Sequence, residues 1–224
     1  MSEKNNKKKG AVVENAPEES FFQKNLKKIA ICVAAIIAII LVIIAADWYF
    51  TRQNTKAAEA LYPCEQLFQQ GNFEKALNGD GQDIVGLAQV VKQYGSTKAG
   101  NVAKLYAGLA SAQLGKFEDA EKFLKDFDTK GDEMISPAAV GALGNVYAQL
   151  GQNDKAVETL KKAAGKADNA VLSPIFLVQA AEILEAEGKA DEALKLYQEV
   201  KDNYRGSIQG QEIDKYIERA KAAK

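Results

Sequence analysis

The feature that most constrains this chain is a short pattern that occurs four times at nearly regular intervals. Each copy consists of a glycine, a polar residue, a variable residue, two polar residues and an alanine. The glycines are Gly71, Gly115, Gly151 and Gly188, and the matching alanines are Ala76, Ala120, Ala156 and Ala193. The glycines are 44, 36 and 37 residues apart. A period in this range indicates one supersecondary unit stacked on copies of itself.

The residues around these landmarks predict pairs of helices. Between Val140 and Leu150 the apolar residues follow the 3.6-residue period of one helix face. Gly151 is expected to end that helix in the left-handed conformation, and Ala156 to let the next helix approach closely. Ser136-Pro137 and Ser173-Pro174 are 37 residues apart, which predicts two helix starts with serine as the N-cap. Such a pair cannot bury its apolar face alone, so stacked copies are expected.

With these residues in place, the chain resembles the tetratricopeptide repeat (TPR) family. The clearest copy runs from Gly141 to Gly151 and carries the family's Leu-Gly, Tyr and Gly, with Ala156 and Ala163 following. The resemblance implies repeats at about 56–94, 98–131, 136–168 and 173–206, with a cap at 207–224. In the first copy Pro63 is expected to kink the helix. The 44-residue interval implies an inserted helix at Asp83 to Tyr94.

A second feature is an uncharged apolar run from Ile29 to Ala46, extended by Trp48, Tyr49 and Phe50. Eighteen helical residues span about 27 Å, close to the thickness of a bilayer's hydrocarbon core. The aromatic residues suit the membrane boundary, and Ser20 to Gln23 matches a helix capping box. We interpret residues 29–50 as an uncleaved transmembrane anchor. A cleaved signal peptide and a buried core helix are the alternatives.

The net charge of −1 is the sum of three unlike segments. Residues 1–28 carry seven lysines and four glutamates, residues 29–46 carry no charge, and residues 47–224 have a net charge of −4. Because lysine-rich flanks stay in the cytoplasm, we expect a cytoplasmic tail at 1–28 and an exported repeat domain at 51–224. In a bacterium this places the chain in the cytoplasmic membrane, with the repeat domain in the periplasm.

The composition excludes most catalytic chemistry. The chain has no histidine and only two cysteines, so imidazole bases, Ser-His-Asp triads and the usual zinc sites are absent. Asp80 and Asp83 beside Gly79 and Gly81 weakly resemble a calcium loop, but the terminal glutamate is missing. The near-neutral charge argues against a nucleic-acid partner. We therefore expect no enzyme activity, no cofactor and no metal.

The TPR resemblance also implies a concave groove for an extended or helical peptide, lined by the first helix of each pair. The residues expected to face it are small, apolar or amide-bearing for the most part. They are Leu105, Leu109, Gln113, Asn145, Gln149, Val178 and Glu182. Such a lining suits an unfolded or apolar polypeptide. Any one of these residues could equally pack against a neighbouring helix.

The expected fold class is therefore all-α, with one transmembrane helix, a TPR solenoid of about four helix pairs and a capping helix. This architecture, with the runs at 76–81 and 97–103, resembles the bacterial ancillary subunits of the SecYEG translocon (YfgM type). The repeat domain also resembles that of a periplasmic cell-division coordinator. The first resemblance implies a protein-binding module whose partners are translocon components, exported chains or a periplasmic chaperone. The alternative is a scaffold for envelope assembly or cell division.

Overall fold

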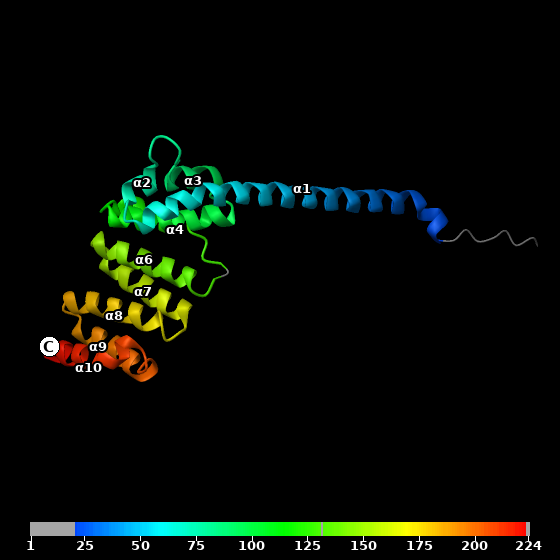
Figure 1. Cartoon of the computed structure of the whole chain (residues 1–224). Coiled ribbons are helices and arrows are strands. Elements are labelled where there is room, and N and C mark those ends of the chain that lie inside the picture. Colours follow the sequence, from blue (N-terminus) through cyan, green and yellow to red (C-terminus); the bar gives the residue numbers. More distant parts are fainter. Residues whose placement is uncertain (1–20, 131, 223–224) are drawn as a thin grey trace, which may run out of the picture. The chain divides into compact units, whose positions relative to one another are not determined.

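The computed structural model describes residues 21–130 and 132–222, and contacts divide the chain into two compact units, Met1–Tyr49 and Phe50–Lys224. We call them the anchor unit and the repeat unit. The described residues form ten α-helices and no strand (Figure 1). The helices are α1 (Phe21–Gln69), α2 (Phe73–Asn78), α3 (Leu87–Tyr94), α4 (Lys98–Gln113), α5 (Phe117–Lys125), α6 (Ile135–Gln149), α7 (Asn153–Ala167), α8 (Ser173–Ala186), α9 (Ala190–Asn203) and α10 (Ile208–Ala222).

The described part of the anchor unit is the N-terminal part of α1, from Phe21 to Tyr49. The large apolar side chains from Ile31 to Ile44 are 48–69% exposed, so no protein core covers this segment. By length and composition α1 is the described helix that could cross a membrane. Residues 1–20, which hold most of the lysine-rich tail and Ser20 of the expected capping box, lie outside the described residues.

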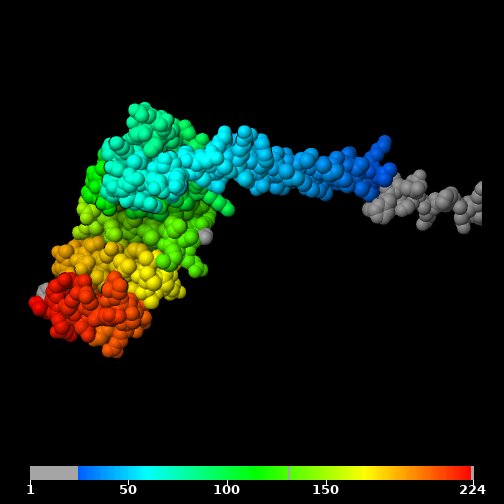
Figure 2. Space-filling view, viewed as in Figure 1, coloured from blue at the N-terminus to red at the C-terminus, as the bar shows by residue number. Residues whose placement is uncertain are grey.

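The repeat unit is a solenoid in which each helix packs on its sequence neighbours. From α4 onward, every consecutive pair of helices is in contact, and α4 also touches α6 while α8 also touches α10 (Figure 1). Figure 2 shows that successive helices of the repeat unit pack against one another without a gap, as far as the C-terminal helix. This nearest-neighbour packing is that of a repeat protein, and it confirms the predicted all-α solenoid.

The four repeat glycines end the first helix of each pair as the pattern predicts. Gly151 has φ +70°, and its N–H donates to the carbonyl of Ala148 at 3.0 Å. The N–H of Gln152 donates to the carbonyl of Tyr147 at 2.9 Å, which completes a Schellman motif. The same pair of bonds and a positive φ recur at Gly71, Gly115 and Gly188.

Small residues then bring the two helices of each pair together. Ala76, Ala120, Ala156 and Ala193 are all fully buried. A Cβ on Gly108 would lie 2.6 Å from Cγ of Leu124, and one on Gly144 would lie 2.8 Å from Cγ of Leu160. Since real Cβ atoms do not approach so closely, glycine at these positions sets the distance between paired helices.

The predicted N-caps at Ser136 and Ser173 are wrong. Helix α6 already begins at Ile135 and α8 begins at Ser173, so both serines lie inside their helices. The backbone N–H groups at the two helix starts donate instead to the side chains of residues further upstream, Asp132 and Asn169. These two residues are also 37 positions apart. Asp132 Oδ1 accepts from the N–H groups of Met134 and Ile135, and Asn169 Oδ1 accepts from those of residues 171 and 172.

The first repeat is irregular, as its sequence suggested. Helix α1 runs through Pro63 without interruption up to Gln69. The inserted helix is present as α3, but it begins at Leu87 instead of Asp83. Its start is delayed because the Asp80 carboxylate accepts N–H bonds from Gln82 and Ile84 at 3.0 and 2.9 Å, which holds these residues in a turn.

Candidate peptide-binding groove

The candidate site is a hollow between the second and third helix pairs. It has a volume of about 380 Å³ and we call it the α4–α6 hollow. Its lining comes from the C-terminal halves of α4 and α6 and from α5 between them. The lining residues are Leu109, Ala112, Gln113, Phe117, Leu124, Ala142, Asn145, Val146 and Gln149.

The structure brings four of the seven sequence-predicted groove residues together in this hollow: Leu109 and Gln113 from α4, with Asn145 and Gln149 from α6. They meet because the helix pairs repeat at 36 residues here, so that each residue of α4 has its counterpart on α6. Leu109 corresponds to Asn145, and Gln113 to Gln149.

The other three predicted residues lie elsewhere. Leu105 is half-buried and packs against the small core cluster formed by Ala120, Leu124 and Val146. Val178 is 7% exposed and belongs to the large C-terminal core. Glu182 is exposed on α8 and does not line the hollow.

Sequence reasoning missed Phe117, which also lines the hollow. It stands two residues after Gly115, at the variable position of the repeated pattern, where the other copies have Phe73, Asn153 and Ala190. The start of the second helix in each pair lies next to the end of the first helix, where the hollow is. An apolar residue at the variable position was therefore a sequence signal that it lines the hollow.

No lining residue of the hollow carries an ionisable group. Its apolar surface comes from Leu109, Phe117, Leu124 and Val146, while Gln113, Asn145 and Gln149 contribute side-chain amides. The amides of Gln113 and Gln149 are on exposed residues. Each amide offers both a donor and an acceptor, which is what the backbone of an extended peptide requires. The arrangement can therefore hold apolar side chains and hydrogen-bond a main chain, and nothing in its lining favours a charged ligand.

A larger hollow of about 770 Å³ lies at the opposite ends of these helices, and it is of a different kind. It is lined by the loops before α4 and α6 and contains Lys98, Lys104, Asp128 and Asp132. Asn101 spans it: its Nδ2 donates to the carbonyl of Asp128 at 2.9 Å, and its Oδ1 accepts from the N–H of the same residue at 2.8 Å. This side chain positions the loop before α6.

Burial and hydrogen bonding shift the pKa values of several titratable groups in the repeat unit. Burial raises the pKa of the Cys64 thiol, so this thiol is protonated and enclosed in the first core cluster. Two backbone N–H bonds lower the pKa of Asp80. Within the described ranges 21–130 and 132–222, no group of three or more possible ligand side chains could hold a metal ion.

A comparison with protein families decides the identity of the fold. The family described as a tetratricopeptide repeat-like domain matches residues 19–167, about two thirds of the chain. The chain belongs to this TPR-like family. Its members' repeats act as scaffolds for binding other proteins, which agrees with the uncharged hollow between the second and third repeats.

A solved structure shows the same TPR-like fold. It contains the nearly identical TPR-like repeats of a Podospora anserina protein described as a kinesin light chain. The two structures align with a TM-score of 0.59 and 18% sequence identity, over 76% of this chain and 87% of the other. At that identity the likeness concerns the fold alone. No protein with a curated description matches the chain.

Proposed function

We propose that the protein is a membrane-anchored TPR module that binds polypeptide segments in the α4–α6 hollow. The observation that carries this proposal is the lining itself, in which apolar side chains alternate with three amides and no charge intervenes. A segment of unfolded chain presents the complementary groups, namely apolar side chains and a main chain without hydrogen-bond partners.

The proposed topology places residues 29–50 across the cytoplasmic membrane of a bacterium, with the N-terminus in the cytoplasm. It rests on the lysine excess before the apolar run and on the exposure of every large side chain along it. Trp48, Tyr49 and Phe50 are 62%, 54% and 53% exposed, as suits side chains at a membrane boundary. The repeat unit then lies in the periplasm.

The partners we propose are newly exported chains or a periplasmic chaperone at the Sec translocon. The support is the resemblance in architecture to the YfgM-type subunits, together with a hollow that suits unfolded polypeptide. A scaffold for envelope assembly or division is the second candidate, since a TPR hollow can also hold a segment of one folded partner.

Photo-crosslinking in intact cells tests the hollow. A photoreactive amino acid replaces Gln113 or Gln149 in the full chain, and Lys161, exposed on α7, provides the matched control position. We expect heterogeneous cross-links to many exported chains from the two positions in the hollow and not from Lys161. A single discrete adduct would favour the scaffold, and equal cross-linking from all three positions would refute the hollow as the binding site.

Two further measurements test the setting. Blue-native electrophoresis after mild solubilisation should show comigration with the translocon, and migration apart from it would contradict the proposed association. A C-terminal tag should be digested when protease is added to spheroplasts. A protected tag would refute the topology and with it every periplasmic partner.

A further inference from the structure

Three strongly exposed apolar side chains occupy corresponding places in the last three units of the solenoid. Met134, Val171 and Ile208 are 51%, 62% and 76% exposed. Each lies within two residues of the start of α6, α8 or α10. They are also spaced by 37 residues, the period of these repeats.

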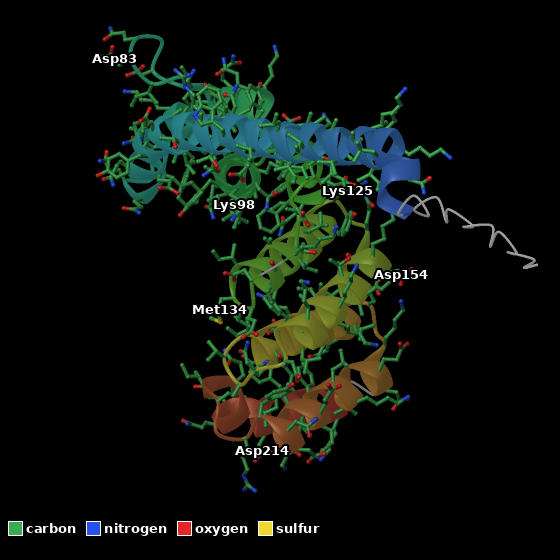
Figure 3. All side chains as sticks on the ribbon, turned by 90° about the vertical axis from the view of Figure 1, so that its right-hand side faces the viewer. Asp83, Lys98, Lys125, Met134, Asp154 and Asp214 are labelled. Carbon is green, nitrogen blue, oxygen red and sulfur yellow. The ribbon has the colours of Figure 1, made fainter. Side chains whose placement is uncertain are left out.

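These positions lie on one edge of the repeat unit, which we call the helix-start edge. The first helices of successive pairs run in the same direction, so the loops before α4, α6, α8 and α10 come together there (Figure 1). Figure 3 looks onto this edge and shows Met134 projecting from it, with Lys98 at the start of α4.

The chain enters the repeat unit at the same edge. Phe50 is the first residue of that unit, and Asn54 follows one helical turn later. Asn54 Oδ1 accepts a hydrogen bond from the N–H of Ala99 at 2.8 Å, which fixes it beside the start of α4. The uncharged apolar segment 29–46 therefore ends only a few residues from this edge along the chain.

Scattered apolar residues on a protein surface are normal, but these are not scattered. Among residues 51–222 that the structure describes, the large exposed apolar side chains are Tyr62, Val85, Met134, Ile135, Val171 and Ile208. Four of these six lie on the helix-start edge. Exposed charged side chains of both signs lie beside these tips: Lys130, Asp132 and Glu133 before α6, Asp168 before α8 and Arg205 before α10.

At two of the tips, side chains bond the backbone N–H groups that precede the helix. Asp132 accepts from the N–H groups of Met134 and Ile135, and Asn169 accepts from those of Val171 and Leu172. Backbone donors that are satisfied within the protein reduce the cost of entering a membrane interface, where an unsatisfied N–H group is expensive.

We propose that the helix-start edge docks on the lipid surface of the membrane in which residues 29–50 are anchored, with Met134, Val171 and Ile208 inserted among the headgroups. The inference rests on the anchoring proposed above. Apolar side chains at the three tips, with polar and charged groups next to them, match the boundary between acyl chains and headgroups. Docking leaves the two ends of the solenoid and its surface between the edges open to partners.

Fluorescence quenching in reconstituted full-length protein tests the proposal. Cys32→Ala is the background, and Cys64 stays because it is fully buried. Val171→Cys, Met134→Cys and Ile208→Cys are each labelled with an environment-sensitive dye. Glu118→Cys, exposed near the start of α5 on the opposite edge, is the matched control. The liposomes contain phosphatidylethanolamine and phosphatidylglycerol, with or without a nitroxide on the acyl chain.

We expect the three labels on the helix-start edge to be quenched about threefold more strongly than the label at position 118. Met134→Asp combined with Ile208→Asp should reduce the quenching at position 171 while the helical circular dichroism stays unchanged. Equal quenching at all four positions would overturn the docking. If the protein does not float with the liposomes in a density gradient, the anchor itself fails. Flotation with equal quenching removes only the edge contact.

Discussion

The guanidinium of Arg219 in α10 donates to both carboxylate oxygens of Glu185 in α8. The Nε–Oε1 and Nη2–Oε2 distances are both 2.7 Å, and the two residues are 34 positions apart. The hydroxyl of Tyr197 in α9 also donates to Oε2, at 2.9 Å. Three helices therefore meet at one carboxylate, and this contact ties the capping helix to the last repeat.

Glu185→Gln should destabilise the cap. The amide keeps the size of the side chain but loses the charge and turns donors toward Arg219. Since the Glu185 side chain is 14% exposed and that of Arg219 is 53% exposed, we expect a loss of about 1 kcal/mol in the free energy of unfolding. Thermal unfolding of the full chain in detergent measures it. Glu218→Gln, whose 72% exposed side chain pairs with Lys221, is the control and should have little effect. Equal effects of both variants would contradict the tie.

The same contact predicts a dependence on pH. The hydrogen bonds from Arg219 hold the pKa of Glu185 below its ordinary value of 4.5. Because the folded pKa is depressed, the stabilisation is fully present above the ordinary value and is lost as the pH falls through the folded pKa. The stability difference between the wild type and Glu185→Gln should therefore be constant near neutral pH and shrink below about pH 4.5. Chemical denaturation at several pH values would show it, and a difference that persists in acid would contradict this account.

Alanine at the glycines between paired helices should destabilise the repeats. A methyl group at Gly108 or Gly144 would meet Leu124 or Leu160, and at Gly144 it would also lie 3.2 Å from the backbone nitrogen of Leu160. We expect a loss of about 1–3 kcal/mol for each variant, with Gly144→Ala the more severe.

The control for these variants is Gly165→Ala. Gly165 lies within α7, and a Cβ there would meet nothing within 4 Å. This substitution should stabilise the protein by about 0.5–1 kcal/mol, because alanine is the better helix former. Denaturant unfolding of the three variants compares them directly. Stabilisation by Gly108→Ala or Gly144→Ala would show that the close approach of the paired helices does not require glycine at these positions.

The local features of the fold could be predicted because they repeat. A glycine that ends a helix and an alanine that admits the next one are each read from a few neighbouring residues, and their period gave the solenoid. The caps at Asp132 and Asn169 share that period, but the Ser-Pro pairs are the stronger local signal for a helix start. The predicted starts of α6 and α8 were therefore too close to the C-terminus.

The contacts that were not predicted depend on distant parts of the chain. Val178 stands 37 residues after Gly141, yet in the last repeat it is covered by the C-terminal core that includes Ile213 and Ile217 of the cap. A period says that two positions correspond, but not what packs over each. One period of 37 residues earlier, the positions that correspond to Glu185 and Arg219 hold Ala148 and Glu182, so self-comparison of the sequence could not reveal this tie.

The α4–α6 hollow predicts a specific effect of added charge on binding. Gln113→Glu with Gln149→Glu keeps the shape of both side chains, removes two amide donors and places two carboxylates in an uncharged lining. Both residues are exposed, so the fold should tolerate the change. With carboxymethylated, permanently unfolded lactalbumin as the probe, we expect affinity to fall about tenfold, which corresponds to about 1.4 kcal/mol.

Gln93→Glu with Gln211→Glu, on exposed residues of α3 and α10, is the matched control because it adds two carboxylates outside the hollow. A general repulsion between the acidic probe and the protein would weaken binding in both variants and would be screened by salt. Loss confined to the variant with both changes in the hollow, and persisting at high salt, places the binding site between α4 and α6, because the lost amide donors act at short range. An equal loss of affinity in both variants would contradict binding in the hollow, because affinity would then depend on the net charge of the repeat unit.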